Sequence, residues 1–231
     1  RRHQKVIEEA PSAAPFFAGE EGQRRRAALH QSAVRLVRHA NYVGAGTVEF
    51  VASSQGEIFF LEVNARLQVE HPVTEMCSGV DLVEQQLRVA SGEALAPEIL
   101  SAELAGHAIE ARIYAEDPAK RFAPQPGRIG AIVWPEEGEG IRIDSGVAAG
   151  QEVTPYYDPL LAKVVAHGAT RAEAIERLAA ALEATKIELT GALGPATTNT
   201  DFCRTLVLSD RFRDASYDTG VAEAMAKALS A

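Results

Sequence analysis

Apolar and polar residues alternate along residues 60–70, and this alternation is the most informative pattern in the chain. Every second position from 61 to 69 is apolar, and the positions between and after them carry Glu62, Asn64, Arg66, Gln68 and Glu70. Successive side chains of a β-strand point to opposite faces, so the pattern predicts a strand with one buried face and one polar face. The polar face contains an asparagine, which strands disfavour, and no lysine, so we expect a binding site there and not a merely solvated surface.

The preceding segment predicts a hairpin that brings two carboxylates together. Residues 46–51 have a strand pattern, and residues 53–56 form a turn cluster that leads back into the alternating stretch. A two-residue turn at Gln55 and Gly56 would place Glu49 opposite Glu62. Like charges about 5 Å apart destabilise a hairpin, and a magnesium or manganese ion held by these oxygen ligands would remove the repulsion. A register shifted by one residue and an ordinary hairpin without metal are both left open by the pattern.

Periodicity elsewhere predicts helices and strands in separate blocks. An apolar stripe indicates a helix over residues 19–40, and a capping pattern predicts another from Asp81 to Ala90. Thr170 and Glu173 form a capping box that opens a helix to about residue 185. Strand patterns cover residues 106–116, 127–134, 141–145 and 161–166, and a short helix follows at 199–208. With a connector near residues 93–105, these elements predict an α+β fold in two parts.

Composition and charge narrow the classes of function. The 231 residues suit one large domain or two small ones, and the net charge of −9 argues against nucleic acid as a partner. No apolar run approaches the roughly 20 residues of a membrane span. Cys77 and Cys203 are far apart and are expected to be reduced thiols, which favours a cytoplasmic or mitochondrial matrix setting. The six histidines lack the spacing of zinc ligands.

The run Glu62-Val-Asn64-Ala-Arg66-Leu-Gln68-Val69-Glu70-His71-Pro72 resembles the active-site signature of biotin carboxylase, the ATP-grasp subunit or domain of the biotin-dependent carboxylases. The Glu-x-Asn part is shared by ATP-grasp ligases generally, whereas the Arg-x-Gln-Val-Glu-His-Pro part is specific to the carboxylase branch. Further similar segments extend the resemblance over roughly residues 1–215: Arg1-Arg2-His3-Gln4-Lys5, His107 to Pro118, Pro155 to Lys163, and Thr198-Asn199.

The resemblance implies a domain organisation. Residues 1–104 correspond to the C-terminal half of an ATP-grasp domain, residues 105–215 to the β-rich biotin carboxylase C-terminal domain with flanking helices, and residues 216–231 to a tail. The nucleotide-fold domain and the glycine-rich lid of a complete biotin carboxylase are not in this sequence, and neither is a biotin attachment site. We therefore expect an isolated chain that is inactive, and a complete enzyme that is a homodimer working with a biotin carboxyl carrier and a carboxyltransferase.

The resemblance also implies the chemistry and the residues that carry it. ATP phosphorylates bicarbonate to carboxyphosphate, and the carboxyl group then moves to biotin on the carrier. Roles carried over to this chain fall into three groups: ATP and Mg²⁺ or Mn²⁺ at His3, Glu49, Glu62 and Asn64; bicarbonate at Lys5, Arg66, Gln68 and the Val69 backbone; and catalysis by Glu70 as general base, with Lys5, Arg66 and Arg112. Arg112 is expected near biotin and bicarbonate, while His71, Asp158 and Lys163 are expected to be structural.

Other interpretations compete with these assignments. Without the resemblance, Arg112 is better explained by a strand-surface salt bridge with Glu110 or Glu116. Another ATP-grasp ligase that joins a carboxylate to an amine would share Glu62 and Asn64 but has no use for the carboxylase run. A third possibility is a non-catalytic piece that serves dimerisation. The sequence does not determine the final carboxyl acceptor, whether acetyl-CoA, propionyl-CoA, methylcrotonyl-CoA, pyruvate or urea.

Overall fold

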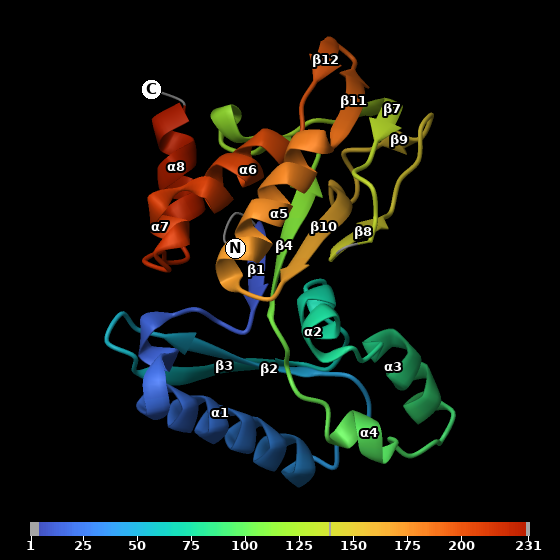
Figure 1. Ribbon diagram of the computed structural model, residues 1–231. Helices are drawn as coiled ribbons and strands as arrows, with labels where there is room; N and C mark the ends of the chain where they lie inside the picture. Colours follow the sequence, from blue (N-terminus) through green and yellow to red (C-terminus); the bar gives the residue numbers. More distant parts are fainter. Residues whose placement is uncertain (1–4, 139, 230–231) are drawn as a thin grey trace. The chain divides into compact units, whose positions relative to one another are not determined.

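The computed structural model describes residues 5–138 and 140–229, which form two compact units (Figure 1). Pro11–Leu104 makes one unit. The segment up to Ala10 and the chain from Ala105 onward make the other. The mixture of helices and strands confirms the α+β class predicted from the sequence. Among the described residues, no helix has both the length and the apolar character needed to cross a membrane.

The Pro11–Leu104 unit combines one hairpin with helices. Its elements in chain order are a 3-10 helix (Pro15–Phe17), α1 (Gly19–His39), β2 (Thr47–Ala52), β3 (Ile58–Asn64), α2 (His71–Ser78), α3 (Leu82–Ala90) and α4 (Pro97–Leu100). The predicted cap of α3 is confirmed, because the Asp81 carboxylate accepts from the Glu84 N–H at 2.7 Å. Burial in this unit is concentrated around α2, where Val73 and Cys77 are buried.

The β2–β3 hairpin confirms the predicted pairing of Glu49 with Glu62, but by a different route. Its loop has three residues and not two, because Ser53 N–H donates to the Glu57 carbonyl at 2.8 Å and closes the turn there. That loop alone would place Glu49 opposite Leu61. Instead, Leu61 is an extra residue in β3, and the resulting bulge shifts the register by one position. The bulge therefore produces the carboxylate pair.

The strand itself is shorter than the alternating pattern predicted. β3 ends at Asn64, which pairs with the first residue of β2, Thr47, so the ladder stops there and residues 65–70 form a loop leading into α2. The prediction of one strand through position 69 is wrong for this reason. The burial of the two faces is also reversed: Leu61 and Val63 are 45% and 41% exposed, whereas Glu62 is half-buried. The polar face is the more enclosed one.

The second unit contains two antiparallel four-stranded sheets. The first has the order β1 (Ile7–Ala10), β4 (His107–Tyr114), β10 (Leu160–Gly168), β8 (Ile141–Ser145). The second has the order β12 (Gly194–Ala196), β11 (Lys186–Gly191), β7 (Gly127–Val133), β9 (Glu152–Val153). A small pair, β5 (Glu116–Asp117) and β6 (Ala123–Pro124), frames a 3-10 helix at Pro118–Lys120. The helices are α5 (Arg171–Ala184), α6 (Thr200–Leu208), α7 (Asp210–Arg213) and α8 (Val221–Leu229).

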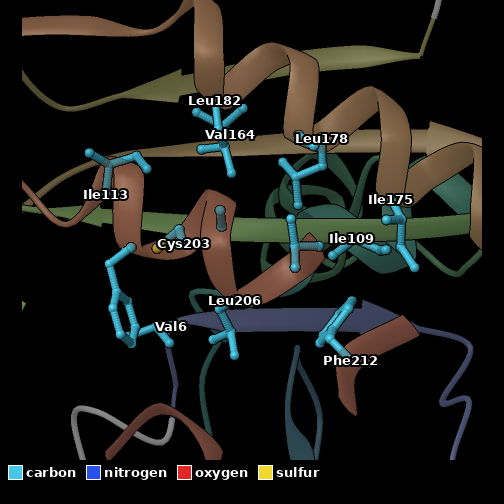
Figure 2. Close-up of a cluster of buried hydrophobic side chains, with 14 of the residues drawn as sticks. Val6, Ile109, Ile113, Val164, Ile175, Leu178, Leu182, Cys203, Leu206 and Phe212 are labelled. Atoms are coloured by element: carbon cyan, nitrogen blue, oxygen red, sulfur yellow. The ribbon is translucent and has the colours of Figure 1, made fainter. Parts of the chain in front are cut away.

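The main hydrophobic core lies between the first sheet and the helices that cover it. Figure 2 shows side chains from β4, β10, α5 and α6 directed toward one another, with Ile109, Leu178 and Leu206 among them. These three side chains are almost completely buried. The predicted capping box opens α5, since Thr170 Oγ1 accepts from the Glu173 N–H at 3.2 Å. One face of β4 thus belongs to the core, and its other face carries Glu110 and Arg112.

Two segments join this unit although the sequence assigned them elsewhere. β1 falls within the predicted first domain, yet it pairs with β4 along Ile7–Ala10, so the strand ladder places it in the C-terminal unit. The predicted tail contains α8, whose Ala222 and Ala226 are buried in the main core. The compact units thus divide at residue 104 as expected, but the segment up to Ala10 and the residues after 215 belong with the C-terminal unit, because long-range pairing and packing decide their place.

Candidate active site

Four polar side chains of the Pro11–Leu104 unit close into a ring. Glu49 Oε1 accepts from Asn64 Nδ2 at 2.8 Å and from Gln68 Nε2 at 2.9 Å. Arg66 then donates from Nη2 to Asn64 Oδ1 and from Nη1 to Gln68 Oε1, both at 3.4 Å. The hairpin supplies Glu49 and Asn64, and the loop after β3 supplies Arg66 and Gln68. The early end of the strand makes this ring possible, because the loop returns over the hairpin.

The ring fixes how each amide is oriented. A carboxylate can only accept hydrogen bonds, so each amide must turn its NH₂ toward Glu49 and its oxygen toward the Arg66 guanidinium. The contacts to Glu49 are short, while both contacts to Arg66 lie at the long end of the hydrogen-bond range. Arg66 Nη1 also donates to the Leu67 carbonyl at 3.1 Å. The two long bonds to the amides can be exchanged for a stronger, charge-assisted contact with a small anion.

The loop that carries the ring is tied to α2 and α3. Gln68 is buried, and its carbonyl accepts from His71 Nδ1 at 2.8 Å. His71 Nε2 lies 3.8 Å from Glu75 Oε2, and Glu75 Oε1 accepts from the Leu82 N–H at 2.6 Å. His71 thus has the structural role expected of it. This chain of contacts explains why an irregular loop can hold Gln68 in place.

The expected metal ligands suit a hard divalent cation. Glu49 and Glu62 are partners across the hairpin, and Asn64 touches Glu49. Carboxylate and amide oxygens are the donors that magnesium and manganese prefer. The expected set consists of two carboxylates and one amide. A cluster of three or more His, Cys, Asp or Glu residues that could hold a metal does not occur in the described part of the chain.

The remaining expected residues of this unit lie at the start of α2. Val69 and Glu70 are half-buried in the turn that precedes the helix. Glu70 occupies the N-cap position of α2, but its side chain does not cap the helix. The turn places Glu70 two residues beyond Gln68.

The C-terminal unit holds the other two described candidates. Arg112 lies on β4, and its Nη2 is 2.7 Å from Glu8 Oε1 in an ion pair of two largely buried side chains. Glu110 Oε1 is farther away, 4.0 Å from Arg112 Nε. The alternative of a surface salt bridge is corrected in two respects, because the pair is buried and its close partner is Glu8. The sequence interpretation did not single out Glu8, and no local pattern links it to Arg112.

Main-chain pairing brings Lys5 beside Arg112. The Arg112 N–H donates to the Val6 carbonyl at 3.0 Å, and Lys5 directly precedes Val6. The described candidates therefore fall into two sets, one in each unit: Lys5 with Arg112, and the ring with Glu62, Val69 and Glu70. His3 lies outside the described residues.

Asn199 is a buried residue whose role the sequence reasoning missed. Its Nδ2 donates to the Arg112 carbonyl at 3.0 Å, and its Oδ1 accepts from the Tyr114 N–H at 2.7 Å. The Asn199 N–H donates in turn to the Tyr114 carbonyl at 3.1 Å. Asn199 thus supplies strand-like hydrogen bonds to β4 where β1 no longer runs beside it, and it fixes the backbone that carries Arg112.

Family models match both parts of the chain. The family model "Biotin carboxylase C-terminal domain" matches residues 110–224, and the model "Carbamoyl-phosphate synthase L chain, ATP binding domain" matches residues 1–98. Biotin carboxylase 2 of Bacillus subtilis is 50% identical over 188 residues, which cover 81% of this chain and 40% of that protein. The mitochondrial propionyl-CoA carboxylase alpha chain of Caenorhabditis briggsae is 44% identical over 220 residues, 95% of this chain and 28% of that protein.

Solved structures extend the agreement to the fold. The biotin carboxylase domain of the Hydrogenobacter thermophilus 2-oxoglutarate carboxylase, a dimer in complex with MgADP, ADP and bicarbonate, has a TM-score of 0.87 and 37% identity. The match covers 99% of this chain and 48% of that one. This chain thus spans less than half the length of these relatives, and with both family models and the fold in agreement, it belongs to the biotin carboxylase family.

Proposed function

We propose that the protein containing this chain carboxylates biotin on a carrier, using bicarbonate and ATP, as part of a biotin-dependent carboxylase. The observation that carries the proposal is the ring of Glu49, Asn64, Arg66 and Gln68. It combines oxygen ligands for a divalent cation with a guanidinium that can bind a small anion. A related domain is described with MgADP and bicarbonate bound, the two ligands that such a ring suits.

In the first step, bicarbonate attacks the γ-phosphorus of ATP, and ADP leaves as carboxyphosphate forms. Glu49, Glu62 and Asn64 would hold Mg²⁺ or Mn²⁺, which supplies charge neutralisation at the phosphates. Glu70 takes the proton of bicarbonate as general base. Arg66, Gln68 and the Val69 backbone orient the anion. From the family resemblance, Lys5 is assigned to bicarbonate and His3 to the nucleotide.

In the second step, the bond between the carboxyl carbon and the phosphate oxygen of carboxyphosphate breaks and the carboxyl group moves to the ureido nitrogen of biotin. The released phosphate takes the proton that this nitrogen loses. Arg66 and Arg112 stabilise the negative charge on the carboxyphosphate fragment and on biotin. We propose three partners: a carrier domain, a carboxyltransferase and a second copy of the subunit. Several relatives are alpha chains of larger carboxylases, which supports the first two partners. We also propose the cytoplasm or the mitochondrial matrix as its location.

A completed enzyme tests the proposed function. The chain would be joined to the N-terminal part of the Bacillus subtilis relative, and ATP cleavage would be measured with bicarbonate and free biotin. We expect ATP cleavage that depends on bicarbonate and produces carboxybiotin. ATP turnover with simple amines in place of biotin would instead identify a carboxylate–amine ligase. A completed enzyme that binds no ATP would support a non-catalytic dimerisation role.

Replacing Glu62 with glutamine in the completed enzyme should weaken the response to Mg²⁺. The substitution keeps the size of the side chain but removes one of two opposed carboxylates, so the half-saturating Mg²⁺ concentration should rise about tenfold. Glu57→Gln, in the exposed hairpin turn, is the matched control and should behave as the parent. An unchanged Mg²⁺ dependence in Glu62→Gln would remove Glu62 from the proposed ligands.

Replacing Arg66 with lysine should separate the two steps. Arg66 reaches two amide oxygens with different Nη atoms, and a single ammonium cannot reproduce this planar fork. We expect carboxylation of biotin to fall about 10- to 100-fold, with a much smaller loss of bicarbonate-dependent ATP cleavage. Parallel loss of both activities would indicate a role in binding alone.

A further inference from the structure

The guanidinium of Arg112 forms a close, buried ion pair with the carboxylate of Glu8. The Nη2 to Oε1 distance is 2.7 Å, and the side chains are only 7% and 14% exposed. A contact of this length between buried, oppositely charged groups is a close ion pair, and removing one partner leaves the other charge buried. Glu110 lies farther away, with its Oε1 4.0 Å from Arg112 Nε.

The backbone of Arg112 is held independently of Glu8. Its N–H donates to the Val6 carbonyl at 3.0 Å, and its carbonyl accepts from Asn199 Nδ2 at 3.0 Å. Asn199 also forms two hydrogen bonds with the backbone of Tyr114, so β4 is hydrogen-bonded at the arginine and again two residues later. The position of the arginine Cα therefore does not need Glu8, and the ion pair with Glu8 acts on the direction of its long, flexible side chain.

The register of β1 and β4 shows why a glutamate at this position acts on Arg112. Glu8 and Glu110 are direct partners across the ladder, and Arg112 follows Glu110 by two residues on the same face of β4. Two opposed carboxylates repel one another, and a buried guanidinium between strands offsets that repulsion. The pairing that brings the Glu8 strand to β4 thus also sets the direction of the guanidinium.

We propose that Glu8 is a positioning residue, whose carboxylate holds the Arg112 guanidinium in the orientation used for biotin and bicarbonate. This inference rests on the proposed function, since Arg112 acts on substrate only if the protein is a biotin carboxylase. Glu8 itself need not touch either substrate. Its effect on the reaction passes through Arg112.

Crystal structures of the completed enzyme test the geometry without using activity. In Glu8→Gln, we expect the Arg112 guanidinium to turn away from its parental orientation, while the backbone of residues 112–114 stays in place. Glu110→Gln is the matched control, since it removes a buried carboxylate of the same cluster and should leave the guanidinium where it was. A guanidinium that keeps its orientation in Glu8→Gln would overturn the proposal.

Kinetics of the same variants test the consequence. We expect kcat for biotin carboxylation to fall about 10- to 100-fold in Glu8→Gln, with KM for ATP within about twofold of the parent. Glu8→Asp, which restores a carboxylate one methylene shorter, should recover part of the loss. Equal kcat losses in Glu8→Gln and Glu110→Gln would overturn the assignment to Glu8. An inactive parent enzyme would count against the proposed function alone, because the crystal structures still decide the role of Glu8.

Discussion

Replacing Glu70 with glutamine in the completed enzyme should lower bicarbonate-dependent ATP cleavage by about 10²- to 10⁴-fold, the contribution typical of a general base. Glutamine keeps the shape of the side chain but cannot take a proton. Glu70 occupies the N-cap position of α2 without capping the helix through its side chain, so the substitution should leave α2 intact. Steady-state ATP cleavage at saturating bicarbonate measures the effect.

The matched control is Glu84→Gln. Glu84 lies on α3 of the same unit, is about half exposed and pairs with Arg88 at 2.7 Å, so its loss should change turnover by less than about twofold. A Glu70→Gln enzyme that retains more than about a tenth of parental turnover would contradict the assignment of Glu70 as the base. Unchanged thermal unfolding temperatures of both variants would show that the loss of turnover in Glu70→Gln comes from the reaction and not from unfolding of the protein.

Replacing Glu9 with alanine should destabilise the C-terminal unit by about 3–5 kcal/mol, as expected when one partner of a buried ion pair is removed. Glu9 accepts from His107 Nε2 at 2.8 Å, from Arg171 Nε at 2.7 Å and from the Tyr217 hydroxyl. Arg171 also donates to the Phe212 carbonyl at 2.7 Å, so Glu9 connects β1 with α5 and the region of α7. Urea unfolding followed by the single tryptophan, Trp134, reports on this unit.

The stability contributed by Glu9 should depend on pH. Burial acts to raise the pKa of Glu9, but the hydrogen bonds from His107, Arg171 and Tyr217 outweigh it, and the pKa lies below its ordinary value of 4.5. A depressed carboxyl pKa stabilises the folded state fully above the unfolded value, and this contribution is lost as pH falls through the folded value. The difference in unfolding free energy between the parent and Glu9→Ala should therefore be constant near neutral pH and shrink below about pH 4.5.

The matched control for Glu9 is Glu183→Gln. Glu183 forms a 3.0 Å ion pair with Arg204 in the same unit, but its side chain is 67% exposed. Exposed pairs contribute about 1 kcal/mol or less, so we expect a correspondingly small loss. If Glu9→Ala cost no more than Glu183→Gln, the network around Glu9 would be incidental to stability.

Local sequence patterns predicted the features that depend on neighbouring residues. The caps at Asp81 and Thr170 need a partner only three residues away, and both are present. The pairing of Glu49 with Glu62 was also predicted, although the loop is one residue longer and a bulge at Leu61 restores the register. Such a compensation could not be read from the pattern, because nothing in a period-two alternation marks which residue leaves the ladder.

The arrangement of the site was predicted only in part. The alternating pattern placed Asn64, Arg66 and Gln68 on one face of a strand, and they do act together, but they meet because the strand ends and the loop returns to Glu49. The identity of the residues was therefore predictable while their geometry was not. The roles of Glu8 and Asn199 were missed because their partner, Arg112, is about a hundred residues away in one case and almost ninety in the other.

The sequence by itself determined the α+β class, the helix caps, the presence of the hairpin and, through the run from Glu62 to Pro72, the resemblance to biotin carboxylase. Tertiary structure decided which unit β1 joins, that α8 completes a core, and which carboxylate holds Arg112. Caps and alternation are set by backbone geometry over a few residues, so the local sequence contains them. Strand pairing between β1 and β4 depends on burial and hydrogen bonding between segments separated by about a hundred residues, and those contacts exist only once the chain has folded.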